Sequence, residues 1–162
     1  DLTVLANVMV GAHSLGRSNF LTAPFGFGTR SEERRLRSRA FEILDELSLT
    51  DLAHRPPVGL PYGTMKQIEL ARALAAEPRL LLLDEPAAGL THSEVADLAD
   101  LIVKIRDHLG LTILLVEHHM AMVMSICTQV VVMELGRKIA DGPPSEVREN
   151  PAVITAYLGS RA

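Results

Sequence analysis

Two pairs of polar residues in this chain carry side chains suited to chemistry on a phosphate. Asp84-Glu85 follows four consecutive leucines at 80–83, and Glu117-His118 follows the apolar run 111–116. Short apolar runs without alternation are typical of strands buried on both faces of a parallel sheet. Because such sheets bind ligands at the carboxyl ends of their strands, we expect both pairs to meet at one sheet edge.

The residue types at this expected edge match the needs of phosphoryl transfer. One carboxylate can hold Mg²⁺, a second can orient or deprotonate water, and an imidazole can donate toward the γ-phosphate. Gly63, at the start of a predicted helix, adds backbone N–H groups and the positive end of the helix dipole, which together can bind an anion. The alternative interpretations are a polar turn after each strand and an ordinary helix end.

The histidines do not predict a metal centre. His118 and His119 are adjacent, but the other four of the six histidines are scattered along the chain. No metal-ligand spacing recurs among them. We interpret His119 as part of the turn that ends a strand.

Strands and helices alternate along the chain, which predicts an α/β fold with a mostly parallel sheet. Apolar periodicity and capping residues predict helices over 31–47, 63–76 and 91–109, and apolar runs predict strands over 80–83, 111–116 and 130–133. A turn at Gly136 leads to the segment 137–140. Helical turns broken at Pro151 are expected over 145–158.

Composition limits the classes of function. The 162 residues are 48% hydrophobic, enough for a globular core, and the net charge is −4 with 4% aromatic residues. This balance supplies neither a phosphate-neutralising surface nor a stacking platform, so nucleic acid is not expected as a partner. The single Cys127 predicts an intracellular chain with a small core residue at that position. We expect neither a leader nor a membrane span, because the sequence opens without a basic-then-apolar segment and has no run of about 18 uncharged apolar residues.

Three segments in order resemble the signature, the Walker B and D-loop, and the switch-histidine segments of ABC transporter ATPase domains. They read LPYGTMKQIELARAL (60–74), LLLLDEPAAGL (80–90) and LLVEHHM (114–120). The tail, GRKIADGPPSEV (136–147) and NPAVITAYLG (150–159), is similar to the ATP-binding subunits of branched-chain amino acid importers. The resemblance covers nearly the whole chain. It implies the carboxy-terminal part of a P-loop NTPase domain, with helices flanking the sheet and a helical signature subdomain.

The resemblance implies a role for each residue at the two strand ends. Asp84 would order Mg²⁺ through water, Glu85 would act as the catalytic base or position the attacking water, and His118 would contact the γ-phosphate of ATP. His119 stands where the family usually has Asp.

The resemblance also implies partners. Tyr62, Gly63 and Thr64 would cap the γ-phosphate of the nucleotide on a second ATPase subunit, identical or related, and Ala88 and Gly89 would face that subunit. Transmembrane permease subunits would hold the pair in the cytoplasm, peripheral on the cytoplasmic face of the inner membrane.

Several features depart from the family pattern. The 162 residues contain neither the phosphate-binding loop G-x-x-x-x-G-K-[ST] nor the glutamine loop. The string 11–18 mimics the former, but Arg17 replaces its lysine, and Pro24 interrupts the helix that should follow. Pro61 replaces the usual signature Ser and so removes a hydroxyl and an N–H donor, while Thr64 replaces a common Gln. We therefore expect weakened capping of the partner's nucleotide.

The sequence predicts three parts: a helical signature subdomain (1–78), the Walker B half of the nucleotide-binding core (79–140) and a helical tail (141–162). The intact protein is expected to hydrolyse ATP and energise uptake of branched-chain amino acids, whereas this chain alone is expected to be inactive. One alternative is a non-enzymatic interaction module that supplies its signature helix to a partner ATPase. Another is the carboxy-terminal lobe of a chromosome-maintenance ATPase, which would need long flanking heptads that the chain does not show.

Overall fold

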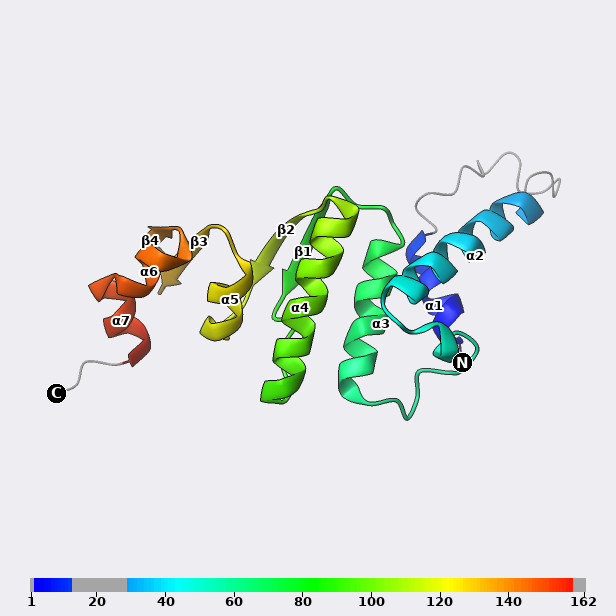
Figure 1. Cartoon of the computed structure of the whole chain (residues 1–162), viewed down its shortest axis with the longest axis horizontal. Helices are drawn as coiled ribbons and strands as arrows, with labels where there is room; N and C mark the ends of the chain where they lie inside the picture. Colours follow the sequence, from blue (N-terminus) through cyan, green and yellow to red (C-terminus); the bar gives the residue numbers. More distant parts are fainter. Residues whose placement is uncertain (1, 13–28, 159–162) are drawn as a thin grey trace. The chain divides into compact units, whose positions relative to one another are not determined.

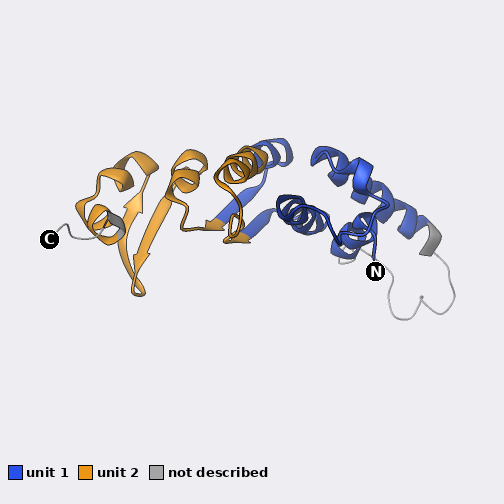
Figure 2. Cartoon of the chain, turned by 90° about the horizontal axis from the view of Figure 1, so that it is seen from below, with its two compact units in different colours: residues 1–82, 104–114 blue, residues 83–103, 115–162 orange. Residues whose placement is uncertain are grey.

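The computed structural model describes residues 2–12 and 29–158, and these form two compact units (Figures 1 and 2). Unit 1 comprises residues 1–82 and 104–114, and unit 2 comprises residues 83–103 and 115–162. The elements are α1 (Val4–Gly11), α2 (Thr29–Glu46), η3 (Thr50–Leu52), α3 (Tyr62–Leu74), β1 (Leu80–Asp84), α4 (His92–Leu109), β2 (Thr112–Val116), α5 (Met120–Ile126), β3 (Val130–Glu134), β4 (Arg137–Gly142), α6 (Pro144–Glu149) and α7 (Pro151–Leu158). Helices and strands alternate from α3 to β3, in agreement with the predicted α/β class, whereas β3 and β4 follow each other directly.

Unit 1 is built on a small helical core. Helix α1 packs against α2 and α3, and its Val4 and Val8 side chains are fully buried. A Cβ atom on Gly11 would overlap the carbonyl oxygen of Arg72, so glycine allows the end of α1 to approach the α3 backbone closely. The predicted α2 and α3 are confirmed, with ends within two residues of those expected.

Strands β1 and β2 are neighbours in one two-stranded sheet. The N–H of Thr112 donates to the carbonyl of Arg79 before β1, and the N–H of Glu85 after β1 donates to the carbonyl of Val116. The start of β1 is therefore bonded to the start of β2, and the end of β1 to the end of β2. The two strands run parallel.

The expectation that β1 is buried on both faces is wrong for the described residues. Leu81 is 5% exposed, but Leu80 and Leu82 are 53% and 64% exposed. Alternate side chains of a strand point to opposite faces. In the described part of the chain, one face of β1 is therefore buried, and the other face, which is also apolar, is exposed to solvent.

Unit 2 contains an antiparallel hairpin of β3 and β4. Its two central turn residues, Leu135 and Gly136, have φ values of 46° and 79°. Positive φ at both positions is the geometry of a type I′ turn, whose twist matches that of paired strands. The hairpin packs with α5, α6 and α7 around a small core of Val123, Val130, Val132, Ala140, Val147 and Val153.

Capping residues define the start of α4. The N–H of Thr91 donates to Glu94 Oε2 at 2.8 Å, and the Thr91 hydroxyl donates to the same oxygen at 2.7 Å. These bonds confirm a start predicted from the Thr91 and Glu94 spacing. They also lower the pKa of Glu94, the side-chain bond having the largest effect.

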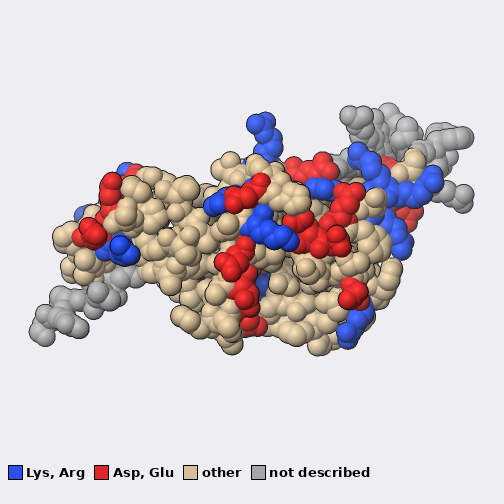
Figure 3. All heavy atoms as spheres, in the orientation of Figure 1, with Lys and Arg blue, Asp and Glu red and all other residues tan. Residues whose placement is uncertain are grey.

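The surface of the described residues mixes charges of both signs. On the face drawn in Figure 3, acidic and basic side chains are interspersed. Among the described helices, none is both long and apolar enough to span a membrane.

Candidate functional site

The ends of β1 and β2 meet in unit 2, as the sequence predicts. The N–H of Glu85 lies 2.8 Å from the Val116 carbonyl oxygen, and His118 Nδ1 lies 3.6 Å from Glu85 Oε1. The His118 and Glu85 side chains are 60% and 54% exposed, and Asp84 is also exposed. This edge therefore offers two carboxylates and an imidazole to a ligand in solution.

The loop after β1 is a pair of tight turns over residues 85–90. The N–H of Ala88 donates to the Glu85 carbonyl at 3.0 Å, and the N–H of Leu90 donates to the Ala87 carbonyl at 3.1 Å. Glu85 and Gly89 have φ values of 45° and 80°. Ala87 is fully buried and anchors the loop, whereas Gly89 is exposed.

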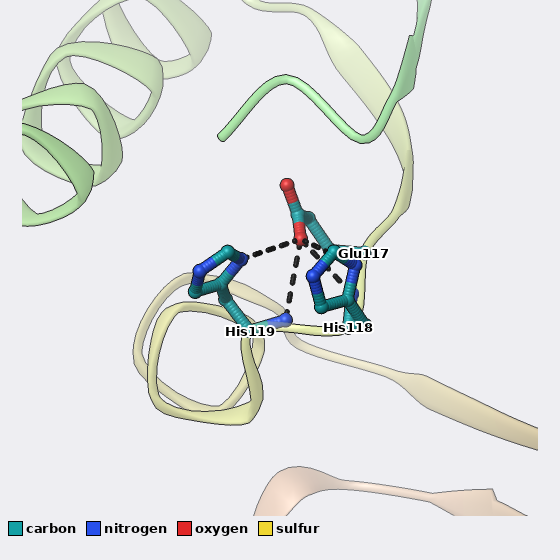
Figure 4. Close-up of side chains that lie close together, drawn as sticks. All are labelled: Glu117, His118 and His119. Carbon is teal, nitrogen blue, oxygen red and sulfur yellow. Dashed lines mark hydrogen bonds and ion pairs between the residues drawn. The ribbon is translucent and has the colours of Figure 1, made fainter. Parts of the chain in front are cut away.

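Glu117 is a buried carboxylate between the two strand ends. Its side chain is 0% exposed, and Oε1 accepts the Ala87 N–H at 2.9 Å. Oε2 accepts the N–H groups of His118 and His119 at 2.9 and 3.2 Å and lies 3.2 Å from the His119 ring nitrogen Nδ1. Figure 4 shows both histidines beside this carboxylate. The sequence placed Glu117 at the edge but did not reveal this bridging role.

Hydrogen bonds determine the charge state of Glu117. Burial alone would raise its pKa, but the bonds from Ala87 and from the two histidines outweigh burial. The net result is a pKa below the ordinary glutamate value, so the carboxylate is ionised at neutral pH.

The same three residues have the composition of a metal cluster. One ligand atom from each of Glu117, His118 and His119 lies within 4.8 Å of the others. However, Glu117 Oε2 already faces two backbone N–H groups and a ring nitrogen, and Oε1 accepts a third N–H. The lone pairs of Oε2, the oxygen nearest both histidines, are therefore occupied, and the cluster is better described as a hydrogen-bonded turn.

The signature residues Tyr62, Gly63 and Thr64 begin α3 and belong to unit 1, whereas the residues described above belong to unit 2. The N-cap residue is Pro61, which makes no side-chain capping bond. The first N–H groups of a helix have no intrahelical acceptor and suit an anion. Tyr62 is 45% exposed, and Lys66 Nζ lies 5.5 Å from its ring centre. Lys66 hydrogen-bonds Glu69, and this bond raises the pKa of Lys66.

The string that mimics a phosphate-binding loop begins in a different setting. Gly11 ends helix α1, whereas a phosphate-binding loop follows a strand. Residues 13–18 of the string lie outside the described residues. The described part agrees with the interpretation that this string is not a phosphate-binding loop.

Comparison with known proteins establishes the family. The family described as ABC transporter matches residues 3–88, more than half of the chain. The chain belongs to the ABC transporter ATP-binding family. Its residues 137–162 also match the family described as branched-chain amino acid ATP-binding cassette transporter.

Relatives of this ABC chain carry matching names. It is 42% identical over 160 residues to the high-affinity branched-chain amino acid transport ATP-binding protein BraF of Pseudomonas aeruginosa. It is 38% identical over 163 residues to LivG of Escherichia coli, which bears the same description. Each alignment covers 98% of this chain and 63% of the relative.

Solved structures confirm the fold of this ABC chain. The ADP conformation of MJ1267, an ATP-binding cassette of an ABC transporter, matches with a TM-score of 0.79 and 30% identity, over 98% of this chain and 63% of that one. A nucleotide-free cassette from an ABC transporter matches with a TM-score of 0.77 and 29% identity, over 98% of this chain and 63% of that one.

Proposed function

We propose that the protein containing this chain is the ATP-hydrolysing subunit of an importer for branched-chain amino acids. The meeting of Glu85 and His118 at 3.6 Å, at the end of two parallel strands, carries this proposal. It gives a carboxylate and an imidazole to one exposed edge of an ABC fold. The names of BraF and LivG support the solute class, because both are branched-chain amino acid transport proteins.

Each residue at this edge has a distinct proposed role. Glu85 accepts a proton from, or orients, the attacking water, and His118 donates a hydrogen bond to a γ-phosphate oxygen. Asp84 is exposed at the end of β1 and offers the hard oxygen ligand that Mg²⁺ prefers. Bound with ATP, Mg²⁺ would neutralise charge that develops on the phosphates. The donor set of the described residues fits this ion.

A second ATPase subunit completes the proposed site. Tyr62, Gly63 and Thr64 present the N-terminus of α3 to the γ-phosphate on that subunit, and Ala88 and exposed Gly89 contact it. Pro61 supplies no hydroxyl or N–H, so this cap has fewer donors than a serine would give. Permease subunits would bind the pair at the cytoplasmic face of the inner membrane.

Transport assays test this function. The subunit containing this chain is assembled with its permease in vesicles, and ATP-dependent uptake of labelled leucine, isoleucine and valine is measured. We expect uptake that a His118→Ala variant reduces by about tenfold or more. Uptake of other solutes but not these three would contradict the assigned solute class.

A further inference from the structure

One buried carboxylate connects the two segments of the proposed site. Glu117 Oε1 holds the N–H of Ala87, thirty residues away in sequence, and Oε2 holds the N–H groups of His118 and His119. A buried charge is tolerated only where such bonds replace water. Because these bonds are charge-assisted and reach backbone atoms, they determine the course of the chain in both segments.

The reactive side chains do not hold each other in place. Glu85 and His118 are both more than half exposed, and Glu85 Oε1 lies 3.6 Å from His118 Nδ1, beyond a normal hydrogen bond. Their separation therefore depends on the backbone that carries them. That backbone is linked through Glu117.

We propose that Glu117 is a positioning residue that holds the His118 turn and the loop 85–90 as one hydrogen-bonded unit. The inference rests on the proposed ATP hydrolysis, since it deepens the account of the same site. Ala88 and Gly89, which would face the second subunit, lie in the held loop. Contact with that subunit is thereby transmitted to His118 through the Ala87 N–H and the Glu117 carboxylate.

Two variants separate the halves of this connection. Glu117→Asp keeps the charge but is one methylene shorter, so it can still accept the nearby N–H groups of His118 and His119 but cannot reach Ala87. Glu117→Gln has one acceptor oxygen and an NH₂ group, so it can satisfy only one segment. Glu149→Gln, at an exposed position in α6, gives the same charge change and serves as the control.

Amide hydrogen exchange tests the connection without any need for activity. In the 162-residue chain, we expect Glu117→Asp to speed exchange at Ala87 by about tenfold or more while His119 keeps its protection. Glu117→Gln should speed amide exchange in one of the two segments. Glu149→Gln should leave exchange in both segments unchanged. Circular dichroism reports whether each variant is folded. Unchanged protection of Ala87 in Glu117→Asp would overturn the proposal.

Steady-state kinetics of the intact transporter then separate positioning from simple structural support. We expect Glu117→Asp to lower kcat for ATP hydrolysis by about tenfold or more and to change KM by less than about twofold. Faster Ala87 exchange with an unchanged kcat would reject the positioning role. If the wild-type transporter hydrolyses no ATP, the proposed function fails, whereas the exchange result still decides whether Glu117 joins the two segments.

Discussion

At the scale of residues, Glu117 makes the site sensitive to acid. Its folded-state pKa lies below the ordinary value of 4.5, while in the unfolded chain it titrates at the ordinary value. A carboxylate with a depressed folded pKa stabilises the fold above its unfolded pKa, and this contribution is lost as pH falls through the folded pKa. The ionisable side chains that face it are those of His118 and His119.

We therefore expect the Ala87 amide to keep its bonded state until the pH falls below the ordinary glutamate range. An NMR titration that follows the Ala87 amide proton shift measures this directly. The signal should move only below about pH 4.5, with the Glu117→Gln variant showing no such transition. A midpoint at or above the ordinary value would contradict the hydrogen-bonded account of Glu117.

The residues of the site differ in how well sequence predicts them. Asp84, Glu85 and His118 follow apolar runs, so strand topology alone brings them to one edge. The bridging role of Glu117 depends on a backbone N–H at Ala87, thirty residues away, and no side-chain pattern encodes such a partner. The precise placement of that loop comes from tertiary packing.

At the scale of elements, the contact between α1 and α3 gives a stability prediction. In a helix, replacing Gly with Ala usually stabilises by about 1 kcal/mol. At Gly11 the added methyl would overlap the Arg72 carbonyl, which is backbone and cannot rotate away. We therefore expect Gly11→Ala to destabilise the chain instead, lowering the free energy of unfolding in urea by about 1–3 kcal/mol.

Gly142→Ala provides the matched comparison. A methyl there would contact the flexible end of the Glu146 side chain at 3.2 Å, which can move. Its effect on the free energy of unfolding should stay within about 0.5 kcal/mol. Equal effects of the two substitutions would show that the Gly11 contact is not as close as described.

The β3–β4 turn offers a stabilising change. Leu135 has φ of 46° and is 99% exposed, so it bears the steric cost of positive φ without gaining burial. Leu135→Asn should raise the free energy of unfolding by about 0.5–1 kcal/mol, because asparagine tolerates this conformation. Gly136→Ala, at the other central position, should lower it by about 1 kcal/mol. Denaturant unfolding measures both, and a destabilising Leu135→Asn would argue against a type I′ turn.

Most elements could be predicted from sequence because periodicity and caps mark them. The Thr91 and Glu94 spacing, the break at Pro151 and the turn at Gly136 all appear in the structure where predicted. Helix α5 was not predicted, since its seven residues are too few to show a period. The burial of β1 was predicted wrongly, because residue type alone does not report whether anything packs on a strand's second face.

At the scale of the whole molecule, the chain carries proposed hydrolytic groups without a recognisable phosphate-binding loop in its 162 residues. It spans 63% of the length of BraF and LivG. We expect the purified chain to bind ATP weakly and to release no phosphate above background, as measured by a coupled phosphate assay. Steady turnover by the chain alone, lost in Glu85→Gln, would contradict this division of roles.

We propose that Glu85 and His118 serve ATP hydrolysis in the intact protein. The most direct test is the steady-state rate of phosphate release by the intact ATPase assembled with its permease, compared between wild type and Glu85→Gln. We expect a measurable wild-type rate and a loss of about 10²–10⁴-fold in the variant, because glutamine cannot accept the proton of the attacking water. A Glu85→Gln enzyme that hydrolyses ATP at the wild-type rate would contradict it.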